Sequence, residues 1–252
     1  MTEDARIAKR RAAKTGRRAA QVEVLAATDP LAAAQDLAKL TISSKNYSSW
    51  SLRGWLMVKM AGLPFEEDRV DVESVDARAE LLLLAPSILV PCLTHREIRV
   101  WDTLAIGEYL HEIAPKAGLM PSDPVQRAHC RSICGEMHSG FSAMRASLPM
   151  NMRTRLQSFK VWSKAQADIE RIIEIWSDCL TRYGGPFLFG PAPNLADAMF
   201  APVASRFTTY AVALPPVCAA YRDTVMEMPL MQQWIADALQ EPDELDELDM
   251  DF

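Results

Sequence analysis

Hydrophobic and polar positions in the first half of the chain follow two different periods. Short runs that are apolar or alternate with a period of two predict strands, whereas apolar residues three or four positions apart predict helices. The predicted strands are Leu40–Ser43, Phe65–Val72, Val90–Thr94 and Ile98–Trp101, and the predicted helices are Trp50–Ala61, Asp76–Leu84 and Thr103–Ile113. The order β-α-β-α-β-β-α contains a parallel pair joined by a crossover helix and ends in a hairpin. We therefore expect an α/β domain with a mixed four-stranded sheet.

The second half of the chain has a helical pattern throughout. It follows the segment Ala114–Pro124, whose three prolines and one glycine indicate a linker. Asn194 followed by Asp197 resembles a capping box, so we interpret Asp197 as a structural residue. We expect the α/β domain over residues 38–116 and an all-helical domain over residues 122–240. The predicted helices of this second domain are Pro124–Leu148, Ser163–Tyr183, Asn194–Val212 and Pro229–Leu239.

Both ends of the chain are strongly biased in charge. Residues 5–22 carry seven basic side chains and no acidic one, and residues 241–252 carry seven acidic side chains and no basic one. Segments of this kind bury little apolar surface. We interpret residues 1–37 as a disordered or helical extension; the alternatives are an upstream start that adds non-native sequence, or a targeting or nucleic-acid-binding arm. The acidic tail, residues 241–252, is interpreted as a solvated end.

The overall composition narrows the class of protein. The 252 residues are 49% hydrophobic and 24% charged, an ordinary globular balance. No apolar stretch reaches about 18 residues, so neither a transmembrane helix nor a membrane partner is expected, and the first forty residues lack the apolar core of a secretory signal. Five scattered cysteines indicate reduced thiols and a cytoplasmic location. The net charge of −6 argues against nucleic acid as a partner.

Four local patterns follow one another along the chain. Asn46–Arg53 (NYSSWSLR) lies between the first strand and the first helix, and Val90–Pro91 opens the third strand. Trp101–Ile106 (WDTLAI) leads into the last helix of the α/β part, and Asn194–Asp197 (NLAD) opens a long helix. Together these patterns resemble the soluble glutathione transferases, in particular bacterial members of the serine type, which are zeta- and tau-like. The resemblance covers residues 38–240 and implies a thioredoxin-like domain followed by a helical domain.

The resemblance implies that a hydroxyl group before the helix Trp50–Ala61 donates a hydrogen bond to the thiol of glutathione, the implied co-substrate. Counting back from Arg53, as in serine-type members, assigns this role to Ser48, with Ser49 as the near alternative and Tyr47 as a third choice. Lowering a thiol pKa by ~1.5 units needs roughly 2 kcal/mol. A hydrogen bond to a charged acceptor contributes about 1.5–3 kcal/mol. From the residues alone, the serines equally fit a helix cap.

The other patterns imply contacts to the remainder of glutathione. Pro91 would follow a cis peptide bond and leave the Val90 backbone free to pair with the ligand. Asp102 would take the ligand ammonium, and Thr103 with the helix N-terminus would hold its carboxylate. From the residues alone, Pro91 also fits an ordinary strand start and Asp102 a plain N-cap. Leu89 and Thr103 depart from the family pattern of a polar residue and a serine, which predicts weaker glutathione binding or a different partner for the glycyl carboxylate.

The helical domain would supply a second-substrate pocket. Tyr47, His138 and Tyr210 are the candidates for its wall. His138 also lies at helical spacing from Cys130 and Cys134, as in some metal sites. Because no fourth ligand is evident and zinc sites usually have four, we predict no metal and interpret the cysteines as core or interface residues.

Three functions are open at the level of the sequence. The first is a glutathione transferase, in which the thiolate attacks a small electrophilic substrate held in an apolar pocket. The second is a glutathione-dependent cis–trans isomerase of the maleylacetoacetate type. Arginines near the pocket, such as Arg145 and Arg153, would favour it, although both are interpreted as surface residues. The third is a non-catalytic binding module on the same fold. The resemblance also implies a homodimer.

Overall fold

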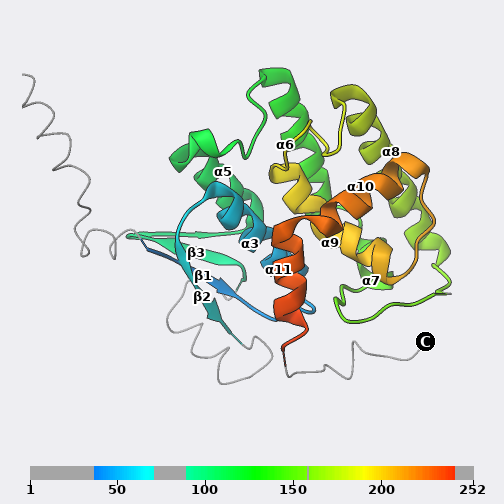
Figure 1. The fold of residues 1–252 in the computed structure, drawn as a ribbon, viewed down its shortest axis with the longest axis horizontal. Helices are drawn as coiled ribbons and strands as arrows, with labels where there is room; N and C mark the ends of the chain where they lie inside the picture. Colours follow the sequence, from blue (N-terminus) through cyan, green and yellow to red (C-terminus); the bar gives the residue numbers. More distant parts are fainter. Residues whose placement is uncertain (1–36, 71–88, 158, 242–252) are drawn as a thin grey trace, which may run out of the picture. The chain divides into compact units, whose positions relative to one another are not determined.

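The structure is a computed structural model that describes residues 37–70, 89–157 and 159–241 (Figure 1). From Ala38 onwards the elements belong to one compact unit. The predicted extension lies outside the described residues except for Leu37. The strands are β1 (Ala38–Ile42), β2 (Phe65–Arg69), β3 (Cys92–His95) and β4 (Ile98–Trp101). The helices are α3 (Ser49–Ala61), α5 (Thr103–Ile113), the short 3₁₀ helix η2 (Pro115–Ala117), α6 (Pro124–Ser139), α7 (Ser142–Ser147), α8 (Ser163–Tyr183), α9 (Leu195–Thr209), α10 (Pro216–Glu227) and α11 (Pro229–Ala238).

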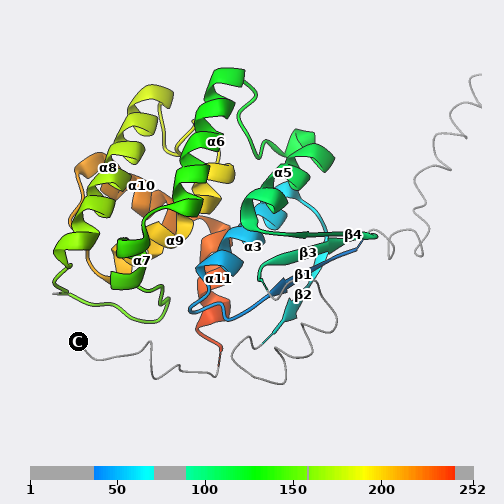
Figure 2. The ribbon, with the colours of Figure 1, turned by 180° about the vertical axis from the view of Figure 1, so that it is seen from behind.

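The four described strands form one mixed sheet in the order β2-β1-β3-β4. β1 and β2 are parallel, with Ala38 opposite Phe65, and α3 connects them. β3 is antiparallel to both β1 and β4, so the predicted hairpin is present. Helices α3 and α5 pack against each other beside the sheet (Figure 2). This arrangement confirms the predicted fold class, a thioredoxin-like sheet domain followed by helices.

Two predicted helices require comment. Asp76–Leu84 lies outside the described residues. The prediction of one helix over Pro124–Leu148 is wrong, because the structure has two helices there, α6 and α7. Gly140 donates its N–H to the carbonyl of Glu136 at 2.8 Å and ends α6, and Phe141 then turns the chain with a φ of 62°. Among the described helices, none is both long and apolar enough to cross a bilayer.

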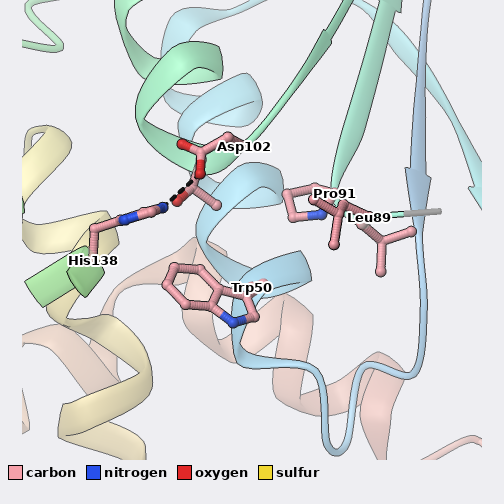
Figure 3. Close-up of a pocket in the computed structure, with 7 residues that line it drawn as sticks. Trp50, Leu89, Pro91, Asp102 and His138 are labelled. Carbon is pink, nitrogen blue, oxygen red and sulfur yellow. Dashed lines mark hydrogen bonds and ion pairs between the residues drawn. The ribbon is translucent and has the colours of Figure 1, made fainter. Parts of the chain in front are cut away.

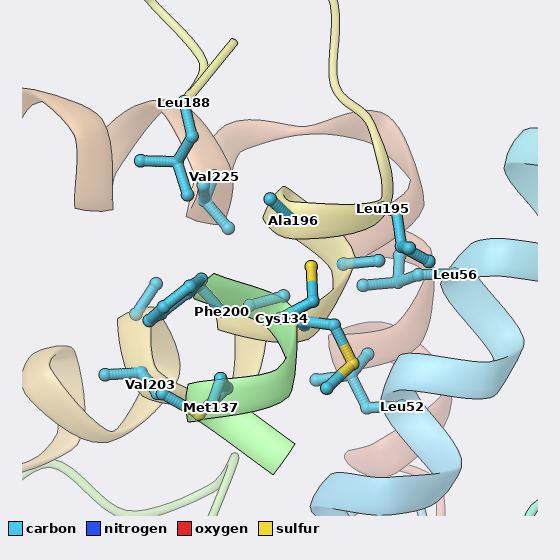
Figure 4. Packing of buried hydrophobic residues seen from close by; sticks show 14 of the residues in the cluster. Leu52, Leu56, Cys134, Met137, Leu188, Leu195, Ala196, Phe200, Val203 and Val225 are labelled. Atoms are coloured by element: carbon cyan, nitrogen blue, oxygen red, sulfur yellow. The ribbon is translucent and has the colours of Figure 1, made fainter. Parts of the chain in front are cut away.

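The core that joins the two halves lies where α3, α5 and α6 meet α9. Figure 4 shows Leu52 and Leu56 of α3 packed with side chains of α6 and α9. α9 is buried along almost its whole length, as expected of a helix at the centre of a domain. A Cβ atom on Gly107 would lie 2.5 Å from Cδ1 of Leu195, so the glycine lets α5 approach α9 without a shift of the Leu195 side chain. The two helices that frame the functional site are therefore fixed against one central helix.

The start of α9 carries the predicted capping box. Asn194 Oδ1 accepts from the N–H of Ala196, and Asp197 Oδ2 accepts from the N–H of Asn194, both at 2.8 Å. The other carboxylate oxygen of Asp197 accepts from the N–H of Leu188 at 3.1 Å and from the hydroxyl of Tyr221 at 3.0 Å. Burial raises the pKa of Asp197 to about 6, although these hydrogen bonds act in the opposite direction. The structural role of Asp197 is confirmed.

The C-terminal end of the described chain holds the turn before α3. The buried carboxylate of Glu241 accepts from the N–H of Lys45 at 2.6 Å, the N–H of Asn46 at 3.2 Å and the hydroxyl of Ser44 at 2.8 Å. The guanidinium of Arg69 lies 3.3 Å from the same carboxylate. The interpretation of the acidic tail as a solvated end is therefore wrong for its first residue, because four donors surround Glu241.

Lys45 ties the same turn to α11 and β2. Its ammonium lies 2.7 Å from Asp237 and 2.6 Å from Glu67, and its side chain is 9% exposed. It also lies 5.5 and 5.2 Å from the ring centroids of Trp55 and Trp234, within the range of cation–π attraction. The indole N–H of Trp234 donates to the carbonyl of Lys45 at 2.8 Å. Residues far apart in the sequence thus fix the turn that leads into α3.

We expect the contribution of Asp197 to the free energy of unfolding to fall as the pH rises. Its pKa is about 6 in the folded chain against ~3.9 in the unfolded chain. The contribution is therefore fully present below pH ~4 and is lost as the pH rises through about 6, by about 3 kcal/mol in total. Urea unfolding of the wild type and Asp197→Asn at pH 4, 5, 6 and 7 measures this change. Stability differences that stay constant with pH would contradict it.

We expect Glu241→Gln to lower the free energy of unfolding by about 1–3 kcal/mol, because the amide leaves some of the four donors without an acceptor. The matched control is Glu227→Gln, on the exposed side of α10, for which we expect a change within about 0.5 kcal/mol. Chemical unfolding of both variants measures the difference. Equal stability of the two variants would show that the buried carboxylate does not hold the turn.

Candidate functional site

A pocket of about 180 Å³ lies between the starts of α3 and α5, the loop before β3 and the end of α6. It brings together all four residues predicted to bind the cofactor and one of the three predicted for the second substrate. Figure 3 shows the indole of Trp50 between the side of the pocket formed by Pro91 and the side formed by His138. The lining residues are Trp50, Leu89, Val90, Pro91, Asp102, Thr103 and His138.

The peptide bond between Val90 and Pro91 is cis, as predicted. The ladder between β1 and β3 reaches only to Cys92, so the Val90 backbone lies outside the sheet pairing at the wall of the pocket. A Cβ atom on Gly54 of α3 would lie 2.6 Å from Cγ of Pro91, closer than real contacts allow. A glycine there lets α3 approach the proline, which itself lines the pocket.

Asp102 and Thr103 form the start of α5. Asp102 Oδ1 accepts from the N–H of Leu104 at 2.8 Å and of Ala105 at 3.4 Å, which makes Asp102 the N-cap. Its φ of 75° is rare for a residue other than glycine, and such outliers concentrate at functional sites. Thr103 is 1% exposed, and its hydroxyl has no hydrogen-bond partner within the described residues. A buried hydroxyl beside a pocket is a group that a ligand can satisfy.

His138 reaches from α6 to the start of α5. Its Nε2 atom lies 2.5 Å from Oδ2 of Asp102 (Figure 3). Its ring centroid lies 5.2 Å from that of Trp50. His138 was predicted for a second-substrate pocket, and that role stays a prediction; in the structure it lines the same pocket as the residues predicted to bind the cofactor. Its pairing with Asp102, the carboxylate expected to meet a ligand ammonium, was not predicted.

Ser48 and Ser49 lie at the start of α3, next to Trp50 but outside the lining residues. The Ser48 hydroxyl accepts from the N–H of Ser51 at 3.3 Å as the N-cap, and it lies 2.9 Å from the Ser51 hydroxyl. Ser49 is 8% exposed, and its carbonyl accepts from Arg53. Ser48 therefore has the capping role that the residues alone allowed. Its contact with a thiol, and the choice between Ser48 and Ser49, stay predictions.

Two guanidinium groups lie against the indole of Trp50. The central carbon of Arg53 is 4.6 Å from the ring centroid, and that of Arg145 is 4.9 Å away. Arg53 is fully buried and donates to the carbonyl of Met199 at 2.8 Å and of Ser49 at 3.2 Å. Burial, followed by the positive charge of Arg145, holds the pKa of Arg53 well below its usual value. Because a guanidinium stays protonated in proteins despite such a shift, a positive charge lies behind the Trp50 wall of the pocket.

Arg145 is a second cation beside this wall. It is half-buried and donates to the carbonyls of Gly140, at 3.1 Å, and Met137, so it covers the end of α6. Burial lowers the pKa of Arg145. Arg206 is a third, buried arginine, and burial, followed by the charge of Arg145, lowers its pKa to about 9. The interpretation of Arg145 as a surface residue is wrong. The charges of Arg53 and Arg145 make this side of the pocket electropositive, and their mutual repulsion lowers the pKa of Arg53.

The structure does not bring Tyr47 and Tyr210 into this pocket. Tyr210 is 5% exposed, donates its hydroxyl to the carbonyl of Pro149 at 3.0 Å and packs edge-on against Phe159. Tyr47 donates its backbone N–H to the hydroxyl of Ser44 at 3.2 Å. Tyr210 is therefore a core residue, and Tyr47 belongs to the turn that Glu241 holds.

The cysteines of α6 are buried in the helical core. Cys130 and Cys134 are fully buried free thiols. The hydrogen bond to Cys130, followed by burial, raises the pKa of Cys134 well above its usual value. His138, which follows Cys130 and Cys134 at helical spacing, pairs with Asp102 instead. In the described part of the chain, no three His, Cys, Asp or Glu side chains are grouped so as to hold a metal ion.

Several residues that shape the site were missed at the level of the sequence. Trp50 was treated only as the start of a helix, and Arg53 only as a reference point for counting. A signal for Arg53 existed, because an arginine inside the apolar stretch SWSLRGWLMV has no acid within one helical turn. Arg145 carried the same signal in the stretch FSAMRASLPM, and it was named as a candidate but interpreted as a surface residue, whereas Glu241 carried no signal because it opens an acidic run.

Known sequences similar to this chain include isomerases and transferases. The chain is 25% identical over 183 residues to a probable maleylacetoacetate isomerase of Caenorhabditis elegans, which covers 72% of this chain and 85% of that protein. It is 29% identical over 166 residues to glutathione S-transferase 1 of Dianthus caryophyllus, which covers 65% of this chain and 75% of that protein.

Solved structures share the fold. A glutathione transferase homologue from Burkholderia, with bound glutathione, superposes with a TM-score of 0.61 at 24% identity, covering 81% of this chain and all of that one. A maleylacetoacetate isomerase from Anaeromyxobacter dehalogenans, also with bound glutathione, gives a TM-score of 0.59 at 24% identity, covering 82% and 97%.

Two protein-family models match this chain. The model described as the glutathione S-transferase N-terminal domain matches residues 47–113, from the turn before α3 to the end of α5. The model described as the glutathione S-transferase C-terminal domain matches residues 152–237. The two matches together span more than half of the chain, in the order in which the sheet and the helices occur. The chain belongs to the glutathione S-transferase family.

Proposed function

We propose that this protein is a glutathione transferase, which uses the thiol of glutathione to conjugate a small electrophilic substrate. The observation that carries the proposal is the pocket itself. One small cavity collects the backbone of Val90 beside cis Pro91, the start of α5 at Asp102 and Thr103, and Trp50 of α3. A peptide with an anionic end fits the first two groups, and Ser48, the N-cap of the helix that carries Trp50, is the donor that we propose for its thiol.

Glutathione fits the groups that the pocket leaves available. The Val90 backbone lies outside the sheet ladder and can pair with a peptide bond of the ligand. The buried hydroxyl of Thr103 lacks a partner among the described residues and stands at a helix N-terminus, where a carboxylate is favoured. Leu89 is 59% exposed and offers an apolar surface to the glycyl end, where a polar residue would hold it more tightly.

The surroundings of α3 favour an anionic sulfur. Glutathione supplies the nucleophilic thiol, whose ordinary pKa of about 8.5 leaves little thiolate at neutral pH. Ser48 would donate its hydroxyl to the sulfur, and the N-terminus of α3 adds roughly 0.3–1 kcal/mol for a negative charge. Arg53 and Arg145 contribute a positive potential behind Trp50 that acts in the same direction.

A second candidate function is a glutathione-dependent cis–trans isomerase of an unsaturated acid. Arg145 favours it, because this half-buried cation lies against Trp50 and donates to carbonyl oxygens of Gly140 and Met137, while the charge of Asp168 helps to keep it protonated. The relatives named as maleylacetoacetate isomerases support the same reading. A homodimer and a cytoplasmic location accompany both candidates as predictions.

We expect Ser48→Ala to lower kcat/KM for the conjugation of glutathione to a chloronitroaromatic substrate by about 10- to 100-fold, the effect of losing a hydrogen bond of 1.5–3 kcal/mol to a charged atom. Ser48→Thr keeps both the cap and the hydroxyl and should retain activity. Thermal unfolding separates lost catalysis from the roughly 1 kcal/mol loss of a helix cap. Steady-state kinetics of wild type, both variants and Ser49→Ala is the measurement.

Two other outcomes of these assays would contradict the proposal, one for the choice of Ser48 and one for the transferase activity. An active Ser48→Ala beside an inactive Ser49→Ala would show that Ser49 is the donor. No turnover of either a chloronitroaromatic or a maleyl-type acid, together with no glutathione binding by calorimetry, would favour the non-catalytic module.

We expect Arg145→Gln to lower kcat/KM for a maleyl-type acid by about tenfold relative to a neutral chloronitroaromatic, because roughly 1.4 kcal/mol of attraction to the acid is lost. Arg145→Lys should retain part of the preference. Arg155→Gln is the control, since Arg155 is exposed and donates only to carbonyls of its own loop. Equal losses for both substrates would argue that Arg145 only supports the end of α6.

A further inference from the structure

The pair formed by His138 and Asp102 joins the two halves of the chain at the pocket wall. Nε2 of His138, on the last turn of α6, lies 2.5 Å from Oδ2 of Asp102, at the start of α5. The side chains are 31% and 40% exposed, so the pair is accessible from the pocket. A charge-assisted hydrogen bond of this kind is one of the stronger polar contacts available at a protein surface.

Both partners are held in place by other contacts. The second oxygen of Asp102 is occupied by the N–H groups of Leu104 and Ala105, which leaves Oδ2 as the oxygen that faces the pocket. These cap hydrogen bonds hold the carboxylate of Asp102. The ring centroid of His138 lies 5.2 Å from that of Trp50, at an interplanar angle of 57°. Both members of the pair are therefore held by contacts besides the one between them.

Among the described residues, three charged groups besides His138 are in contact with this pair or with Trp50 beside it. Asp102 is the acid that His138 meets from α5, while Arg53 of α3 and Arg145 of α7 lie against Trp50. Both arginines disfavour a further cation. A ligand ammonium that enters the pocket must therefore reach Asp102, and Oδ2 is the atom that His138 already contacts. Two hydrogen-bond donors then compete for one carboxylate oxygen.

We propose that His138 is a specificity-determining residue that occupies the ammonium subsite of the pocket in the free protein. Its imidazole N–H stands in for the ligand amine on Asp102, so binding of a ligand with a primary ammonium displaces the side chain from the carboxylate. The competition lowers the affinity for every such ligand and leaves ligands without the amine unaffected. The inference rests on the proposed function, because glutathione is the ligand that supplies the ammonium.

The test compares two ligands by calorimetry on the full chain: glutathione, and its analogue in which a glutaryl group replaces the γ-glutamyl group and the amine is absent. His138→Ala and His138→Phe both remove the donor, and the second keeps an aromatic ring against Trp50. We expect each variant to bind glutathione about fivefold more tightly, the factor for ~1 kcal/mol of an exposed pair, with binding of the analogue unchanged. His129→Ala is the control, since His129 lies on the same helix and pairs with Tyr183 at 2.8 Å.

A second readout follows the imidazole directly. In ¹⁵N NMR spectra, the ring resonances of His138, assigned by their loss in His138→Ala, should shift on addition of glutathione and remain in place with the analogue. Unchanged or weaker glutathione binding by both variants, or equal changes for the two ligands, would overturn the inference while the proposed function stands. A wild type that binds neither ligand would overturn the proposed function, and the inference with it.

Discussion

The site depends on one buried cation, the guanidinium of Arg53, which fixes the start of α3 against the helical domain. It donates forward to the carbonyl of Met199 on α9 and back to the carbonyl of Ser49 one turn earlier. A buried charge without an ionic partner is expensive unless its donors are satisfied. Met199 lies in the helical half of the chain and Ser49 at the start of α3. These two hydrogen bonds hold the start of α3 against α9 and thereby position Ser48, Ser49 and Trp50.

The turn before α3 is also held by a buried charged group whose hydrogen-bonding capacity is satisfied, but here the charge is negative. Glu241 is a buried anion whose four donors come from the turn and from β2, and Lys45 is a nearly buried cation between two acids and two indole rings. These contacts join residues almost two hundred positions apart in the sequence. The turn that leads into α3 is therefore held by residues of α11 and by Glu241, although the lining residues of the functional site come mainly from the sheet domain.

This dependence explains which features the sequence could predict. The parallel strand pair with its terminal hairpin and the capping box at Asn194 rest on patterns within a few residues, the cis bond before Pro91 was implied by the family resemblance, and all three are present. The break at Phe141 lies inside a continuous helical pattern, and it is the Arg145 side chain, folded back on α6, that satisfies the carbonyls there. Glu241 and the pairing of His138 with Asp102 depend on contacts between distant elements, so no local pattern could have indicated them.

The distribution of charge around the pocket agrees with a ligand that carries more negative than positive groups. Arg53 and Arg145 supply two positive charges behind Trp50, while the carboxylate of Asp102 is engaged by the cap of α5 and by His138. Glutathione carries two carboxylates and one ammonium, and its thiolate would add a further negative charge. If glutathione is the ligand, as we propose, the arginines would attract its negative groups, and its single ammonium would have to displace His138 from Asp102. Affinity and selectivity would then arise from different residues, since the arginines attract anions in general and the Asp102 carboxylate would discriminate among them.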